Sequence, residues 1–287
     1  MVSNWTSRLV AALRGRVGSA PAPDSKDQKH GLDEYVTTYP GPQNAIDILK
    51  GWNQAFPAQY GVSAGSMALY NDPRIHWAIE KAGGVAGKRV LEVGPLEAWH
   101  TYMLEQHQPV LLDAVEANKL SFLRCLVVKE IVGLKIARFH LGDAQLWLEQ
   151  RPERYDVVIA SGVLYHMQDP IRFLRAIAAR TDSLFLWTHY VDDVAMPPGD
   201  PRRGAFISPP EVVLAAGVEV KLYPRTYLGA WQNASFCGGM HDIHRWIEKE
   251  SLIALLRALG LSEIEVSFDQ TDHTYGPACC IFAKRPA

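Results

Sequence analysis

Between residues 88 and 190 the chain alternates short apolar runs with amphipathic segments, and this alternation constrains its fold more than any other feature. Five runs are each long enough for one strand: RVLEV, PVLLDAVEA, KIARFHL, YDVVIAS and SLFLWTHY. Helical spacing of apolar residues separates them, over Trp99 to Glu105, Lys119 to Val132, Ala144 to Gln150 and Pro170 to Ala179. Such strands belong to parallel sheets covered by helices. The pattern predicts an α/β fold whose mostly parallel sheet carries helices on both faces.

Other regions flank this pattern. Residues 1–31 read as an arm and a proline-bearing linker, and residues 32–86 as an aromatic-rich preface with helices over 43–54 and 73–82. Asp72 before Pro73 is expected to cap the second of these helices. The core is expected over 87–287, with a proline-rich insertion at 190–246, a helix over 248–259, and a closing strand pair, SEIEVSF and PACCIFAK.

Composition bounds the class of protein. Hydrophobic residues make up 48% of the 287 residues, charged residues 21%, and the formal net charge is -2, as in a globular protein without a polybasic surface. The four cysteines form no CxxC pair, which excludes a zinc knuckle and a disulfide framework. Charges interrupt the apolar N-terminal stretch and no apolar run is long enough for a stable membrane insertion, so we expect a cytoplasmic protein.

Four motifs stand at the carboxyl ends of the expected strands, where open α/β sheets bind ligands: VLEVGPLEAWHT, VEAN, GDAQ and YDVVIASGVLYHMQDP. In this order the segment from about residue 80 to 287 resembles the class I S-adenosylmethionine (SAM)-dependent methyltransferases. The resemblance implies a Rossmann-like sheet of seven strands, SAM as the cofactor and methyl transfer as the activity. A nicotinamide-dependent oxidoreductase is the weaker interpretation, because no GxGxxG follows the first strand.

The resemblance also implies cofactor-binding residues. Glu116 would accept the ribose hydroxyls and Asp143 the adenine amino group, while Val163 and its neighbours would line the methionine part. The full set is Glu92, Gly94, Leu96, Thr101, Glu116, Ala117, Asn118, Asp143, Ala144, Ser161, Gly162, Val163 and His166. Leu96 and Ala98 depart from the family, which usually has glycine at both positions. An ordinary strand-to-helix turn, a solvated glutamate and a helix N-cap are the plain alternatives for the first three motifs.

Histidines are the candidates for catalysis. Methyl transfer to a hydroxyl needs a base near neutral pH, which suits histidine. His189 at the end of the fifth strand is the first choice, with His166 as an orienting residue and His241 as a further candidate. No metal is expected. The weak alternative is a cation held by His189, Asp192, His241 and His244.

Three functions compete for this chain. The first is O-methylation of a small-molecule or glycan hydroxyl, with the aromatic residues Tyr227, Trp231, Phe236 and Trp246 of the insertion as a lid or packing platform. The second is a tRNA-modifying enzyme, because SGVLYH and the following DP are similar to wobble-uridine carboxymethyl-transferring enzymes. The third is a binding module without catalysis. The arginines of 172–180 and 202–225 are expected to form a solvated face, which disfavours nucleic acid as a partner. A homodimer is compatible with the sequence.

Overall fold

The computed structural model describes residues 32, 34–230, 236 and 238–286. The chain divides into two units, residues 1–40 and 41–287, and the second unit contains every helix and strand described below. The expected N-terminal arm of residues 1–31 lies outside the described residues, as does Trp231. None of the helices described is long and apolar enough to cross a membrane.

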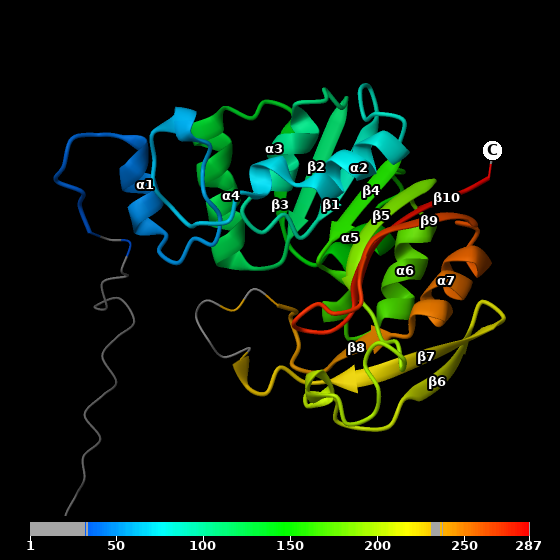
Figure 1. Ribbon diagram of the computed structural model, residues 1–287. Coiled ribbons are helices and arrows are strands. Elements are labelled where there is room, and N and C mark those ends of the chain that lie inside the picture. The colour runs from blue at the N-terminus through cyan, green and yellow to red at the C-terminus, as the bar shows by residue number, and fades with distance from the viewer. Residues whose placement is uncertain (1–31, 33, 231–235, 237, 287) are drawn as a thin grey trace, which may run out of the picture. The chain divides into compact units, whose positions relative to one another are not determined.

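A seven-stranded sheet with the order β3-β2-β1-β4-β5-β10-β9 forms the centre of the second unit (Figure 1). Its strands are β1 Arg89–Val93, β2 Leu111–Glu116, β3 Ala137–Leu141, β4 Val157–Ser161, β5 Ser183–His189, β9 Glu263–Gln270 and β10 Ala278–Lys284. The first five run parallel, and β10 is antiparallel to both β5 and β9. This topology confirms the expected Rossmann-like, mostly parallel sheet.

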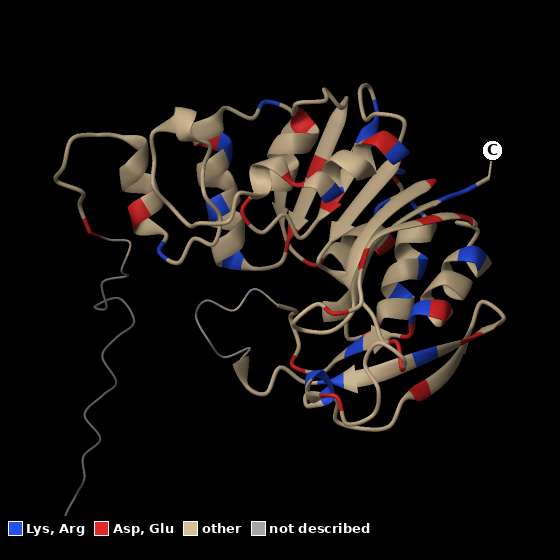
Figure 2. Ribbon diagram, viewed as in Figure 1, with Lys and Arg blue, Asp and Glu red and all other residues tan. Residues whose placement is uncertain are grey.

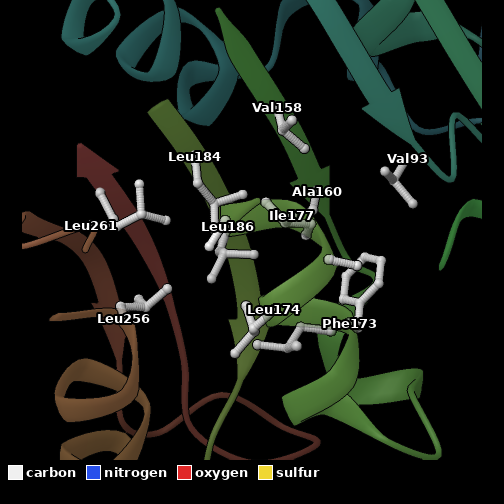
Figure 3. Packing of buried hydrophobic residues seen from close by; sticks show 14 of the residues in the cluster. Val93, Val158, Ala160, Phe173, Leu174, Ile177, Leu184, Leu186, Leu256 and Leu261 are labelled. Atoms are coloured by element: carbon white, nitrogen blue, oxygen red, sulfur yellow. The ribbon is translucent and has the colours of Figure 1, made fainter. Parts of the chain in front are cut away.

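Alternate side chains of the strands feed two apolar clusters on opposite faces of the sheet. Val158 and Ala160 belong to the cluster that α5 Ala144–Gln150, α6 Pro170–Ala178 and α7 Lys249–Ala258 cover (Figure 3). Val157 and Ile159 point the other way, toward α2 Pro73–Lys81 and α3 Trp99–Glu105. The helix α4 Lys119–Val132 packs on β2 and β3. Burial on both faces explains why these strands are apolar throughout.

The preface is less helical than expected. Helix α2 begins as predicted, with the Asp72 side chain accepting a hydrogen bond from Arg74 N at 2.9 Å. The expected helix over 43–54 is wrong in its second half, because α1 Pro42–Ile48 stops at Leu49, before Gly51 with its φ of +82°. A left-handed residue ends an α-helix. The remainder consists of irregular chain and short 3₁₀ turns at Ala58–Tyr60 and Leu69–Asn71.

The insertion after β5 contains a second sheet, which is not expected from the sequence. Its antiparallel strands, in the order β6-β7-β8, are β6 Glu211–Ala215, β7 Val218–Arg225 and β8 His244–Ile247. Ala216 and Gly217 join the first two with φ values of 51° and 83°, as a two-residue hairpin turn requires. Helix α7 packs against β7, which ties this sheet to the main one (Figure 1).

Candidate functional site

The loop after β1 keeps a glycine-like backbone without the usual glycines. Gly94, Leu96 and Ala98 have φ values of 68°, 54° and 63°. A left-handed backbone costs roughly 1–2 kcal/mol for a residue with a Cβ. A Cβ at Gly94 would lie 3.0 Å from Cγ2 of Val163, so the loop passes directly beside the end of β4. The departure at Leu96 and Ala98 therefore changes the side chains of the loop but not its course.

Glu116 at the end of β2 holds this loop in place. Its Oε2 accepts a hydrogen bond from Leu96 N at 3.1 Å, and its Oε1 accepts one from Asn118 N at 2.8 Å. Burial raises the pKa of the Glu116 carboxyl. Each carboxylate oxygen has two lone pairs, so both oxygens keep capacity for a further donor.

Glu92 and Thr101 form a buried pair behind the loop. Thr101 is fully buried on α3, and its hydroxyl donates to Oε2 of Glu92. Burial raises the pKa of the Glu92 carboxyl to about 7. A buried carboxyl that is only partly ionised near neutral pH both donates and accepts hydrogen bonds.

Asp143 lies at the end of β3, next to Glu116. The backbone N–H of Gly142 donates to the carbonyl of Glu116 at 2.9 Å. Oδ1 of Asp143 caps α5 by accepting from Gln145 N at 2.7 Å, which confirms the N-cap interpretation. No bond to Oδ2 is found among the described residues, so this oxygen is available to a ligand. A depression of about 490 Å³ opens beside Asp143, with Val115, Leu141 and Trp147 in its wall.

The end of β4 completes this group of strand ends. Gly162, with a φ of 79°, donates its N–H to the carbonyl of Trp187 on β5 at 2.9 Å. Val163 follows it and faces Gly94. Ser161 is partly exposed, and a 3₁₀ turn at Leu164–His166 comes next. The ends of β1 to β4 thus meet at one edge of the sheet, where the sequence predicts the cofactor.

His189, at the end of β5, is 6% exposed and enclosed by aromatic rings. Its ring is parallel to Trp246 at 4.9 Å and meets Tyr165 and His273 edge-on at 4.7 and 4.9 Å. Nδ1 donates to the carbonyl of Gly276 at 2.9 Å, since a carbonyl only accepts. That bond leaves the lone pair on Nε2. Burial lowers the pKa of His189 to about 4, so its ring is neutral near pH 7.

His166 and His244 lie in the same cluster. Nδ1 of His166 is 2.5 Å from the hydroxyl of Tyr227, and burial lowers the pKa of His166 to about 3. The ring of His244 stacks on Tyr227 at 4.0 Å, and its Nδ1 donates to the carbonyl of Asp242 at 3.0 Å. His241 is exposed, and the described residues show no ring contact or hydrogen bond that joins its side chain to the others.

The structure does not assemble the alternative metal ligands. Within residues 34–230 and 238–286, no group of three His, Cys, Asp or Glu side chains is placed to hold a metal ion. The Asp192 carboxylate instead accepts from the backbone N–H groups of Val194 and Ala195, at 2.8 and 3.1 Å. Asp192 therefore stabilises the turn that follows it in the chain.

Sequence reasoning missed several residues of the histidine cluster. Trp187 is two positions before His189 on β5, so strand alternation places both on one face. His273 lies in the β9–β10 connection, which returns to the end of β5 because Ala278 pairs with His189. The expected closing strand pair, whose connection contains His273, carried part of that signal. Arg225 comes from the second sheet and had no recognisable signal.

Comparison with known proteins gives a concordant result. Residues 67–266 match the family model described as a methyltransferase domain. The curated relatives include a tRNA U34 carboxymethyltransferase of Campylobacter concisus, 26% identical over 40% of this chain and 42% of the relative. A ubiquinone biosynthesis O-methyltransferase of Aeromonas salmonicida is 29% identical over 38% of this chain and 44% of that protein. The matches thus span less than half the length of these relatives.

Among solved structures, the N-terminal domain of EvdMO1, crystallised in the presence of SAH and D-fucose, has a TM-score of 0.63 and 23% identity. The match covers 85% of this chain and 95% of that domain. The longer EvdMO1 structure has a TM-score of 0.55 and 19% identity, over 85% of this chain and 46% of that one. At these identities the likeness establishes the fold.

Proposed function

The chain belongs to the methyltransferase-domain family, and from this premise we propose that it methylates a hydroxyl group of a small molecule or saccharide, with S-adenosylmethionine as donor and His189 as general base. The observation that carries the proposal is the state of His189, a neutral imidazole whose Nδ1–H is bonded to the carbonyl of Gly276. Its remaining lone pair, on Nε2, suits it to take the proton from a hydroxyl.

The residues at the strand ends fit S-adenosylmethionine. Glu116 keeps free lone pairs on both oxygens for two vicinal hydroxyls, and Oδ2 of Asp143 is free for an amino group. Gly94 allows the loop to lie against Val163, which leaves the backbone exposed to a ligand at this edge. The cofactor supplies a methyl group that its sulfonium charge has already activated. The chain's own task is then to orient the acceptor and to remove its proton.

Rings around His189 support a planar or saccharide acceptor. Tyr165 and Trp187 are partly exposed, and each has a ring within 6 Å of the His189 ring. Aromatic faces of this kind stack on sugar rings and on other aromatic rings. The relative named as a ubiquinone biosynthesis O-methyltransferase agrees with a hydroxyl acceptor.

Binding of the cofactor can be tested separately from chemistry. We expect Glu116→Gln to weaken calorimetric binding of S-adenosylhomocysteine by about 10- to 100-fold, because hydrogen bonds to a charged group contribute about 1.5–3 kcal/mol. Glu130→Gln, an exposed change on α4, is the matched control and should leave binding unchanged. Equal affinities of the wild type and Glu116→Gln for S-adenosylhomocysteine would show that Glu116 does not bind the cofactor.

Chemistry is tested with His189→Gln in methyl-transfer assays against hydroxyl acceptors. The variant should bind S-adenosylhomocysteine normally but turn over the acceptor at least about 100-fold more slowly, as expected for loss of a general base. Normal turnover would refute the assignment of His189. His241→Gln serves as the comparison, because that exposed histidine lies apart from the cluster.

The second candidate is a tRNA-modifying alkyl- or methyltransferase. Two curated relatives carry the name tRNA U34 carboxymethyltransferase, at 26% and 27% identity. Transfer to uridine would use the same strand-end site, so RNA binding distinguishes the two functions.

A further inference from the structure

Arg225 on β7 is a half-buried cation without a counter-ion. Burial lowers the pKa of its guanidinium, and the described residues offer it no carboxylate partner. Its neighbours in the insertion differ, because Arg202 pairs with Asp200 at 2.7 Å and Arg203 pairs with Asp193. The expected solvated face of arginines therefore describes Arg202 and Arg203, which form ion pairs with aspartates, but not Arg225. Leaving a cation half-buried and unpaired is unfavourable unless another molecule supplies the anion.

The guanidinium of Arg225 lies over the indole of Trp246, with Cζ 4.1 Å from the ring centroid. The same indole stacks on His189, the proposed base, at 4.9 Å. Trp246 is 2% exposed, and its Nε1–H has no acceptor among the described residues. Two donors in contact, one charged and one neutral, therefore lack acceptors next to the proposed methyl-transfer site.

The positive charge of Arg225 acts on the histidine rings around it. Arg225 lies close enough to His166, His189 and His244 for its charge to lower the pKa of each of them. Since these histidines are neutral near pH 7, the fixed charges beside them are the guanidinium and the Asp242 carboxylate, which acts on His244. The Asp242 oxygens already accept hydrogen bonds from Thr226 Oγ1 and Tyr227 N, so the guanidinium is the charge without a partner among the described residues. A planar guanidinium binds the two oxygens of a carboxylate or phosphate side by side.

We propose that the methyl acceptor is an oxyanion, a hydroxylated carboxylate or phosphate ester, whose charged group binds Arg225 on the Trp246 platform. This inference rests on the proposed function and names its substrate class. The anion held by Arg225 positions the acceptor hydroxyl toward His189, which shares the Trp246 ring with Arg225. According to this proposal, neutral sugars and neutral phenols are not the preferred acceptors.

A titration that needs no turnover tests the proposal. The full chain with S-adenosylhomocysteine is titrated with D-glucuronate, with inorganic phosphate and with D-glucose at constant ionic strength. The readout is the indole N–H resonance of Trp246, assigned with Trp246→Phe. We expect glucuronate, phosphate or both to shift it saturably, and glucose to leave it in place. The tighter anion identifies the charged group as carboxylate or phosphate.

Variants decide whether Arg225 is the binding group. Arg225→Gln should weaken anion binding at least 10-fold, Arg225→Lys should retain part of the affinity, and Arg257→Gln, exposed on α7, should leave it unchanged. If Arg225→Gln fails to fold, the test is the decrease in anion affinity that Arg225→Lys shows relative to the wild type. Absence of a shift with both anions, or a shift that survives in the Arg225 variants, overturns the inference. Failure of the proposed function would instead appear as absent methyl transfer with anion binding intact.

Discussion

The imidazole of His189 has two nitrogens with separate tasks. Nδ1 is bonded to the carbonyl of Gly276 on the connection before β10, and that bond fixes the tautomer. Nε2 then carries the lone pair, as a base acting through this nitrogen requires. The aromatic enclosure keeps the ring unprotonated near neutral pH.

The pH profile of methyl transfer follows from this ring. A base acts only when unprotonated, and burial lowers the pKa of His189 to about 4. We expect kcat/KM, corrected for the ionisation of the acceptor, to stay level from pH 7 down to about pH 5. It should fall about tenfold per pH unit below pH 4. Circular dichroism at each pH confirms that the chain remains folded. A midpoint near 6.5, the ordinary pKa of histidine, would show that burial does not tune this residue.

A comparison of Gly94 with Gly133 distinguishes the effect of a left-handed backbone from the effect of a close neighbouring side chain. Gly94 and Gly133 have similar φ values, 68° and 75°, but only Gly94 has a neighbour that a Cβ would meet. Gly94→Ala and Gly133→Ala should each lower the free energy of unfolding by about 1–2 kcal/mol. Binding of S-adenosylhomocysteine should weaken only in Gly94→Ala, as measured by calorimetry. Equal loss of binding in both variants would contradict the role of the β1 loop.

Among the elements, the preface is fixed to the cofactor loop by one carboxylate. Glu97 is fully buried, and its two oxygens accept from the backbone N–H groups of Asn53 and Gln54, both at 2.9 Å. Arg124 of α4 also reaches Oε1 of Glu97, at 3.3 Å. Glu97 thus joins the preface to the loop after β1, next to the contacts of Phe56 and Tyr70 with Trp99.

Removal of this carboxylate should be among the most destabilising changes in the chain. We expect Glu97→Ala to lower the free energy of unfolding by about 3–5 kcal/mol, because it leaves Arg124 as an unpaired buried cation and orphans two N–H groups. Urea unfolding provides the measurement. Glu130→Ala, an exposed change on α4, is the control and should change the free energy of unfolding by less than about 0.5 kcal/mol. A small effect at Glu97 would mean that the preface is held elsewhere.

Regular elements were predictable where one physical signal dominated. Asp72 with Pro73 marks the start of α2, and continuous apolar runs mark the parallel strands. The hairpin of β6 and β7 was difficult to predict because Pro209 and Pro210 precede it and Pro224 lies within β7. The dipeptide Ala216-Gly217 between the two strands is nevertheless a turn signal. The end of α1 depended on local chain geometry beyond the apolar pattern, namely the left-handed Gly51 and the bond from Trp52 Nε1 back to the carbonyl of Ile46.

At the scale of the whole molecule, the strand-end motifs predicted a set of residues that meet at one edge of the sheet, because parallel strands bring their carboxyl ends together there. The acceptor side was less accessible to prediction. It combines β5, the β9–β10 connection and the second sheet, as the contacts of His189 with Gly276 and Trp246 show. Local sequence carries little information about contacts between segments so far apart.

The distribution of charge leads to a prediction about RNA. Lysines and arginines are spread over α2, α4, α6, α7 and β7, with acidic residues among them (Figure 2). Arg172 of α6, for example, pairs with Glu149 at 2.7 Å. We therefore expect unfractionated tRNA to bind with a Kd of about 10⁻⁵ M or weaker at 150 mM salt, as for nonspecific contact. Filter binding against poly(U) is the check. A preference for tRNA with a Kd below about 10⁻⁷ M would favour the tRNA-modifying function.

The pairing of β5 with β10 sets an order of events during synthesis. His189 leaves the ribosome 87 residues before Gly276, the residue whose carbonyl fixes its ring. At about 5–20 residues per second, translation takes several seconds to cover that interval. During it, β1 to β5 can pair while the outer edge of β5 is still open. The strand ends proposed to bind the cofactor can therefore meet before the ring of His189, the proposed base, is oriented by Gly276.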